Sequence, residues 1–326
     1  MVRKFLRRTL AFLGLAATAF AAPPAMAAAA KPALWEVSDP DTKIYLFGTI
    51  HLLPTNYPWR TRAMEKAIAS SDTLYVETIV DQQNPRVLAA ELARLGFSPG
   101  LLPLASRIHP AKRPLLEAAI AKSGVPRNVY DRMETWAAAF TLLGVQFKSL
   151  GLHGEHGVEQ TLRTAFATAG KPVGQLETNS EQLGFFDTLP QNAQRALLEG
   201  AIENPQTMSN DFSGMLQSWA SGDVEAIART FNQGLAASPE LMDALLRRRN
   251  ANWSNWIQRR LATPGTIMVA VGAGHLAGPE SVQTLLQRQG YRIRRVQSRS
   301  PGAKTLQLGE KSSLLLFFSR HLLTSR

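Results

Sequence analysis

The sequence of 326 residues contains no cysteine. This absence excludes disulfide bonds, a thiol nucleophile and a lipid anchor attached through a cysteine. It also means that a bound metal ion must be held by histidine, aspartate, glutamate or asparagine. A G-x-S-x-G nucleophile elbow and a phosphate-binding P-loop are missing as well, which argues against the enzyme classes built on those motifs.

The chain also lacks the pattern of a nucleic-acid platform, although its formal net charge is +11. Part of the basic excess comes from arginine-rich segments at 247–249, 259–260 and 292–295. Aromatic residues do not interleave with these segments, so we interpret them as solvated faces of helices or strands. We therefore expect no nucleic-acid partner, and only mild attraction to anionic membranes or acidic substrates.

Past residue 27, no apolar run reaches the length of a membrane span, so we expect no transmembrane segment in the mature protein. The first 27 residues have the three parts of a secretory signal peptide: a basic start, an apolar run over 10–20, and the cleavage site Ala25-Met26-Ala27. We predict removal of residues 1–27 and export to the periplasm or beyond. The general secretory route is favoured over the twin-arginine route, because Leu6 stands where the latter prefers a small polar residue.

Four apolar, β-prone segments each end just before a histidine or a glutamate. These segments, each with the residue that follows it, are 43–49 with His51, 73–76 with Glu77, 172–176 with Glu177 and 266–272 with His275. Continuous apolar runs bounded by glycine are typical of strands buried on both faces of a sheet. Ligands of open α/β sheets bind beyond the carboxyl ends of the strands. The four side chains are therefore predicted to meet at one edge of a sheet.

The remaining segments predict an α/β protein with a central sheet flanked by helices. Residues 28–326 are expected to form one domain, with a helical insertion at about 84–150 and a helical block at about 180–262. Within these regions we expect helices at 59–70, 85–95, 111–122, 131–149, 157–169, 239–261 and 279–289. Further strands are expected at 33–37, 291–296 and 314–318. The strand, helix and strand ending at Glu77 form a βαβ unit.

Imidazole and carboxylate groups at one sheet edge favour a divalent metal ion such as Mn²⁺, Co²⁺ or Zn²⁺. We predict that His51 and His275 bind it with Glu77 or Glu177, and that the other glutamate acts as a base or orients the ligands. In an alternative reading, each histidine merely begins the next helix. Arg249, late in the long helix, is predicted to hold substrate or transition-state charge, although it could be one more residue of an arginine run.

Three weaker patterns are interpreted as structural. Gly272-Ala273-Gly274 followed by Gly278 has the wrong spacing for a dinucleotide site and no acidic residue at the required distance. His153-Gly154-Glu155-His156 lies in a glycine-rich loop and lacks the i, i+4 geometry of a helical zinc motif. His109 precedes a proline in a linker.

The residues from about 33 to 297 resemble the TraB/GumN family, which includes the Tiki proteins. The resemblance is carried by Gly48-Thr49-Ile50-His51, Glu77-Thr78, Leu176-Glu177-Thr178, Arg249-Asn250 with Trp253, and Gly272-Ala273-Gly274-His275. It implies a fold related to erythromycin esterase and ChaN-like proteins, with the two G-x-x-H histidines and a glutamate at a metal-dependent site. Tiki members are metalloproteases using Mn²⁺ or Co²⁺, and TraB-type members act on or sequester peptide pheromones. One departure is Glu159, where bacterial members usually have aspartate.

Together, residues and resemblance predict an exported metal-dependent hydrolase that acts on a peptide or protein substrate. His51, Glu77 and His275 are the predicted metal ligands, and Glu77, Glu177 and Arg249 the predicted catalytic residues. Two alternatives remain open at this point. The chain could sequester a peptide or haem without turnover, or it could be a metal-independent esterase of the erythromycin esterase type.

Overall fold

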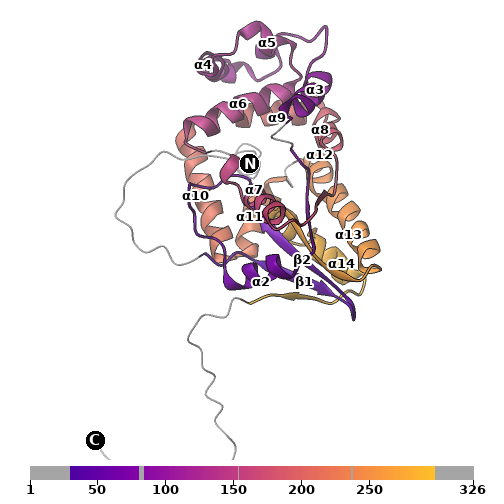
Figure 1. Ribbon diagram of the computed structural model, residues 1–326. Coiled ribbons are helices and arrows are strands. Elements are labelled where there is room, and N and C mark those ends of the chain that lie inside the picture. The colour runs from indigo at the N-terminus through magenta and orange to yellow at the C-terminus, as the bar shows by residue number, and fades with distance from the viewer. Residues whose placement is uncertain (1–29, 81–83, 153, 236–237, 298–326) are drawn as a thin grey trace, which may run out of the picture.

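The computed structural model describes residues 30–80, 84–152, 154–235 and 238–297 (Figure 1). The predicted signal peptide over 1–27 and the strand expected at 314–318 lie outside these residues. Within the described part of the chain, no helix is both long and apolar enough to cross a membrane.

A mixed sheet of six strands lies at the centre of the fold, in the order β4-β3-β5-β2-β1-β6. The strands are β1 (Leu34–Ser38), β2 (Thr42–Thr49), β3 (Thr73–Val76), β4 (Val173–Gln175), β5 (Gly265–Gly272) and β6 (Ile293–Arg295). Neighbouring strands among β4, β3, β5 and β2 pair in parallel, whereas β1 is antiparallel to both β2 and β6. The four strands predicted to end at site residues therefore share one carboxyl edge.

The two longest strands, β2 and β5, pair over their full length, from Thr42 opposite Gly265 to Thr49 opposite Gly272. Their residues are almost all buried, as expected for apolar runs in the middle of a parallel sheet. Glycine at position 48 leaves room for a close approach, because a Cβ atom there would lie 3.0 Å from the Cα atom of Ala273, closer than an ordinary contact. The two strand ends can thus approach each other closely just before their histidines.

Alternating side chains of these strands divide the core between the two faces of the sheet. On one face, Leu46 and Val269 pack with Trp253 and Ile257. On the other face, Phe47 belongs to a larger core that extends through the helical layers. In the view of Figure 1, α4 and α5 lie at the end of the molecule opposite to β1 and β2.

Helices fill the connections between the parallel strands. Helix α2 (Arg62–Ser70) joins β2 to β3, and its N-cap Thr61 accepts a hydrogen bond from the Met64 N–H. Between β3 and β4 lie α3 (Pro85–Leu95), η1 (Leu104–Ser106), η2 (Pro110–Lys112), α4 (Arg113–Ser123), α5 (Arg127–Arg132), α6 (Thr135–Ser149), η3 (Gly154–His156) and α7 (Val158–Thr168). Between β4 and β5 lie α8 (Asn179–Asp187), α9 (Gln191–Ala201), α10 (Pro205–Ser221), α11 (Val224–Leu235), α12 (Pro239–Met242), η4 (Asp243–Arg247) and α13 (Arg248–Leu261). After β5 come η5 (Ala273–Leu276) and α14 (Val282–Arg288).

The structure divides the single helix expected at 131–149. Helix α5 ends at Arg132 and α6 begins at Thr135, because the backbone is extended at Met133 and Glu134. The buried Arg107 guanidinium holds this joint: it donates hydrogen bonds to the carbonyl oxygens of Asp131 and Met133, each at 2.5 Å. A cation bound to backbone carbonyls from another segment leaves no local signal in the helix sequence.

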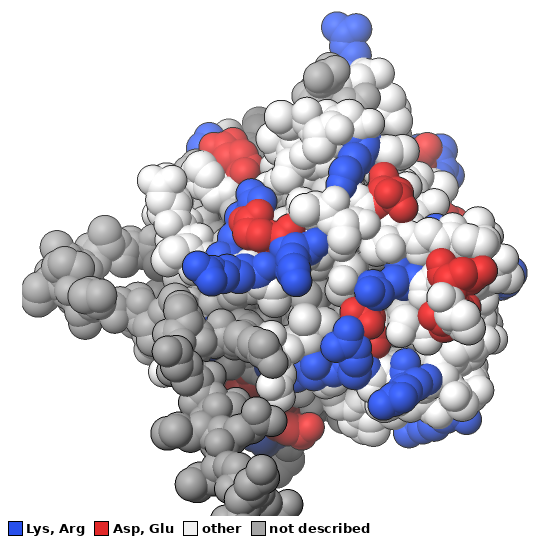
Figure 2. All heavy atoms as spheres, turned by 60° about the horizontal axis from the view of Figure 1, so that its bottom comes forward, with Lys and Arg blue, Asp and Glu red and all other residues white. Residues whose placement is uncertain are grey.

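The basic surface expected from the net charge is interrupted by acidic side chains on the face shown in Figure 2, where lysine and arginine side chains lie beside aspartate and glutamate. Ion pairs such as Arg60 with Glu65 and Arg294 with Glu36 have this mixed character. The exclusion of a nucleic-acid partner stays a prediction.

Candidate metal centre

The carboxyl edge of the sheet brings together the four side chains that follow the parallel strands. Glu77 directly follows β3, and His51 and Glu177 each lie two residues beyond β2 and β4. His275 lies in η5, the short turn that follows β5. The side chains of His275, Glu77 and Glu177 are all at least nine-tenths buried, whereas that of His51 is 30% exposed. Only His51 of the four is thus substantially open to solvent.

Three of the residues around this edge could hold a metal ion. His51, Glu77 and Glu159 each offer one ligand atom, and these atoms lie within 4.8 Å of one another. Glu159 comes from the first turn of α7. His275 is not in this group, although its Nε2 atom lies 3.9 Å from Oε1 of Glu77. The ligand set of His51, Glu77 and His275 therefore stays a prediction, and Glu159 is a donor that strand patterns missed.

Glu159 is held against the β2 end by two contacts. Its Oε2 atom lies 2.5 Å from Nδ1 of His51, and its Oε1 atom accepts a hydrogen bond of 2.9 Å from the Thr49 hydroxyl. Burial disfavours the charged imidazole, but the carboxylates of Glu159 and, to a smaller extent, Glu77 together outweigh burial and raise the pKa of His51 to about 9. Solvent screens part of this interaction because the imidazole is partly exposed. With Nδ1 facing Glu159, Nε2 is the ring nitrogen left for a ligand or a proton.

The start of α7 is positioned by a backbone contact with β2. The Val158 N–H donates to the carbonyl oxygen of Ile50 over 3.0 Å. A Cβ atom at Gly157 would lie only 1.9 Å from the carbonyl oxygen of His51, so only glycine permits this approach. The segment Gly157-Val158-Glu159 is thus the sequence signal for Glu159. It could be recognised through the family resemblance but not from strand periodicity.

Arg249 occupies the buried side of the site, immediately after the π-helical segment η4. Its guanidinium donates to Oε2 of Glu77 at 2.5 Å and to Oε2 of Glu177 at 3.2 Å, with a further short contact to Oε1 of Glu177. It also stacks over the Trp253 ring, at 4.7 Å from the centroid. One buried cation therefore faces two buried carboxylates.

The two carboxylates respond differently to this shared cation. Burial opposes the charge of Glu77, but Arg249, the two histidines and the Gly272 N–H at 2.6 Å together lower its pKa below the usual range. Burial raises the pKa of Glu177, and the nearby charge of Glu77 acts in the same direction. Glu77 therefore gives up its proton at a lower pH than Glu177 does.

His275 is held as a neutral imidazole by partners on both ring nitrogens. Nδ1 lies 2.6 Å from the amide oxygen of Asn250, and Nε2 lies 3.1 Å from a guanidinium nitrogen of Arg249. An amide oxygen only accepts and a guanidinium only donates, so Nδ1 carries the proton and Nε2 presents its lone pair to Arg249. Burial and the charge of Arg249 lower the pKa of His275 to about 3. To bind a metal ion, Nε2 must first give up its hydrogen bond from Arg249.

Gln182 of α8 completes the polar shell. Its amide nitrogen donates to Oε2 of Glu77 at 3.2 Å and to Oε1 of Glu177 at 3.1 Å. The beginning of α8 is fixed by a capping box between Thr178 and Glu181. Gln182 is not predicted from the sequence, because a single glutamine on a helix has no diagnostic spacing.

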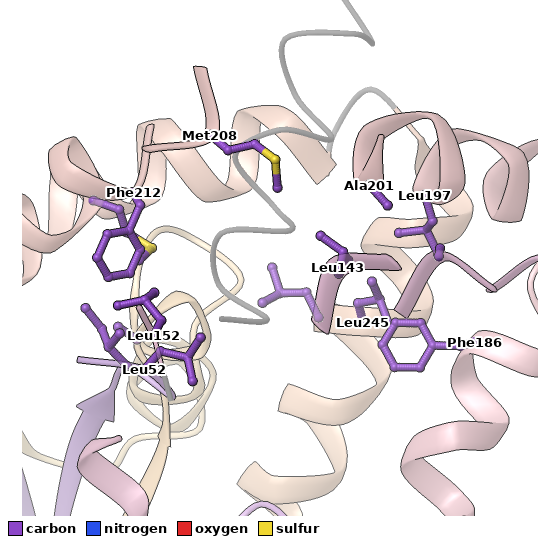
Figure 3. Packing of buried hydrophobic residues seen from close by; sticks show 14 of the residues in the cluster. Leu52, Leu143, Leu152, Phe186, Leu197, Ala201, Met208, Phe212 and Leu245 are labelled. Atoms are coloured by element: carbon purple, nitrogen blue, oxygen red, sulfur yellow. The ribbon is translucent and has the colours of Figure 1, made fainter. Parts of the chain in front are cut away.

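A cavity of about 510 Å³ opens onto these groups. His51, Glu77, Glu159, Arg249 and His275 line it together with side chains of α6, α8 and η4. Among the latter, Leu143, Phe186 and Leu245 lie close together in Figure 3. The cavity volume lies within the range of small-ligand sites, which is about 300–1,000 Å³. Glu177 does not line the cavity, because it lies behind Arg249.

The three sequence patterns that we interpret as structural lie in turns and at helix ends. Gly272 ends β5 and the following residues form η5. The Nδ1 atom of His109 accepts a hydrogen bond from the Ala111 N–H and caps η2. Of the histidine-rich loop, residues 154–156 form η3 in front of α7, and His153 lies outside the described residues. None of these residues belongs to the described group of potential metal ligands.

Comparison with known proteins agrees with the resemblance seen in the motifs. The uncharacterized protein YbaP of Escherichia coli (strain K12) is 27% identical over 248 residues, which cover 74% of this chain and 87% of YbaP. The YbaP protein of Shigella flexneri gives the same values. No solved structure matches the chain. The model of the TraB/PrgY/gumN family matches residues 33–295, which include the whole sheet and every site residue described above, so this chain belongs to the TraB/PrgY/gumN family.

Proposed function

We propose that this chain is an exported, metal-dependent hydrolase that cuts peptide bonds. One observation carries the proposal: His51, Glu77 and Glu159 place three potential metal donors within 4.8 Å of one another beside a cavity of about 510 Å³. Export rests on the basic start, apolar run and cleavage site of residues 1–27. The G-x-x-H strand ends also support a relation of the sheet to erythromycin esterase and ChaN-like proteins.

The residues present suit a divalent ion. Imidazole nitrogen and carboxylate oxygen are donors for Mn²⁺, Co²⁺ and Zn²⁺, and a negatively charged set favours a cation. We assign the ion to His51, Glu77 and Glu159. His275 stays in the proposal as a further donor, because its Nε2 atom lies 3.9 Å from Oε1 of Glu77, although it now accepts a hydrogen bond from Arg249. When bound, such an ion polarises a carbonyl group and lowers the pKa of a coordinated water molecule.

The side chains around the ion would divide the remaining tasks. Arg249 keeps Glu77 ionised and oriented, and its cationic charge lies beside the place where a carbonyl oxygen would become negative. Glu177 fixes Arg249 from the side away from the cavity. Gln182 bridges Glu77 and Glu177 from the cavity lining. Glu159 accepts a hydrogen bond from Nδ1 of His51 and thereby orients the imidazole ring. A carboxylate behind a histidine ligand commonly fixes its tautomer.

The proposal is tested with protein purified without chelators. Elemental analysis should find a divalent ion in the unmodified chain and little in His51→Ala, and a peptide library should be cut by the former only. Glu155→Gln, an exposed change in η3, is the matched control and should keep both metal and turnover. Full turnover in a metal-free sample would overturn the metal-dependent proposal.

A second candidate is a metal-independent esterase, favoured by the 2.5 Å contact between Glu159 and Nδ1 of His51. A carboxylate that orients an imidazole in this way leaves Nε2 as a general base for water at a pH above the His51 pKa of about 9. Ester hydrolysis that resists chelation and is lost in both His51→Ala and Glu159→Gln would favour this candidate. Ester hydrolysis that stops on chelation would exclude it.

A further inference from the structure

The cavity beside the metal centre has an apolar wall that the proposed chemistry does not use. Helix α6 contributes Phe140, Leu143 and Phe147, α8 contributes Leu183 and Phe186, and η4 contributes Leu245. Phe140, Phe147 and Leu183 are only partly buried, so part of each side chain remains uncovered by the protein. Burying apolar surface in such a pocket is favourable by about 25 cal/mol per Å².

Ionisable groups are confined to a small part of the cavity lining. Five of them, His51, Glu77, Glu159, Arg249 and His275, belong to the metal centre. The sixth, Arg163 on α7, donates to the Val80 carbonyl oxygen at 3.0 Å. The α6 and α8 wall offers no ionic partner of its own. A charged substrate group placed there would lose its hydration without compensation.

We infer that the wall formed by α6, α8 and η4 is a specificity pocket for a large apolar side chain, such as leucine, phenylalanine or methionine, next to the peptide bond that is cut. The inference rests on the proposed peptidase function and deepens it. Thr78, Gln160 and Gln182 also line the cavity and offer uncharged hydrogen-bonding groups, which suit a peptide main chain better than an unbranched hydrocarbon. A substrate with alanine or aspartate at this position should be cut much more slowly.

Gly144 provides a way to close the pocket without touching the metal centre. It lies inside α6, lines the cavity, and has no heavy atom within 4 Å of the position of an added Cβ atom. A larger side chain there would project into open space and fill the pocket. Glycine is also the poorest helix former after proline, so the replacement should not weaken α6. Gly214 in α10 matches it as a control, because its added Cβ would likewise meet nothing within 4 Å and it does not line the cavity.

The experiment compares the unmodified chain, Gly144→Leu and Gly214→Leu on internally quenched peptides that differ at one position, occupied by leucine, phenylalanine, alanine or aspartate. Mass spectrometry locates the bond that is cut. In the unmodified chain and in Gly214→Leu, leucine or phenylalanine should raise kcat/KM at least about tenfold over alanine, the scale of losing methylene groups from an apolar pocket. Gly144→Leu should lose this preference while its metal content stays unchanged.

Binding is measured separately, by calorimetry with the leucine and alanine peptides carrying a reduced, uncleavable amide bond. Turnover without apolar preference, or a preference that survives in Gly144→Leu, would overturn the specificity pocket and leave the peptidase proposal standing. Tight binding of the leucine peptide that Gly144→Leu abolishes, with no turnover of any peptide, would support the pocket and refute the peptidase. If Gly144→Leu and Gly214→Leu lost the preference for the leucine peptide equally, the cause would be a general folding effect, and the assignment of the pocket to α6 would be refuted.

Discussion

Replacing Arg249 by methionine should destabilise the protein strongly, and divalent metal should reverse part of the loss. Arg249 is 6% exposed and lies between Glu77 and Glu177, whose side chains are each 7% exposed. Methionine keeps much of the packing against Trp253 but leaves two buried carboxylates without their cation. Removing one partner from a buried ion pair costs about 3–5 kcal/mol. For a domain of more than 250 residues, with an unfolding entropy of about 2.1 cal/mol/K per residue, this corresponds to a fall in Tm of roughly 5–9 °C.

The matched control is Arg247→Met, two residues earlier on the same helical stretch. Arg247 is 50% exposed and lies 3.7 Å from Glu280, so its loss should change stability by less than about 0.5 kcal/mol. Urea denaturation followed by circular dichroism gives both free energies of unfolding, and thermal melts are repeated with Mn²⁺. Because Arg249→Met frees Oε2 of Glu77 and Nε2 of His275, added Mn²⁺ should raise its Tm more than that of the unmodified chain. Equal stability of the two variants would refute the role assigned to the buried cation.

Three further changes test the site. Glu159→Gln should weaken Mn²⁺ or Zn²⁺ binding at least about tenfold in calorimetry with little change in Tm, because it removes a charged donor and the partner of His51; affinity equal to that of Glu155→Gln would remove Glu159 from the metal centre. His275→Ala should lower metal affinity less than His51→Ala does, since Nε2 of His275 faces Arg249; an equal loss of metal, measured by elemental analysis, would instead make His275 a full ligand. Gly157→Ala should destabilise the protein by about 1–3 kcal/mol in urea denaturation, because its Cβ would meet the His51 carbonyl oxygen at 1.9 Å. Gly184→Ala, where nothing lies within 4 Å, should be neutral or stabilising, and equal effects of the two would contradict the close contact.

The convergence of four strand ends could be predicted from sequence because its signals are local. The apolar composition of each run predicts by itself that the strand is buried, and parallel strands in one sheet must end on the same edge. These local signals are enough to predict that His51, Glu77, Glu177 and His275 lie together. The local elements were also close to those expected, for example α3 at 85–95 and the hairpin formed by β1 and β2.

Contacts made by helix side chains could not be predicted in this way. Glu159, Gln182 and Asn250 reach the site from three separate helices, and each resembles an ordinary polar residue on a helix surface. The strand order was also beyond local signals: β2 and β3 are linked by one helix, yet β5 lies between them. Pairing between segments so far apart depends on the register of the whole sheet.

The position of β5 has a consequence for how the chain matures. Because β5 occupies the centre of the parallel strands, β2 and β3 have no bridge between them until Gly265–Gly272 has been synthesised. More than four-fifths of the polypeptide must therefore leave the ribosome before the sheet can close. Contacts between distant segments also slow folding. A chain that passes through a secretion channel must remain unfolded until it has crossed, so late arrival of the central strand would suit the export that we propose for this one.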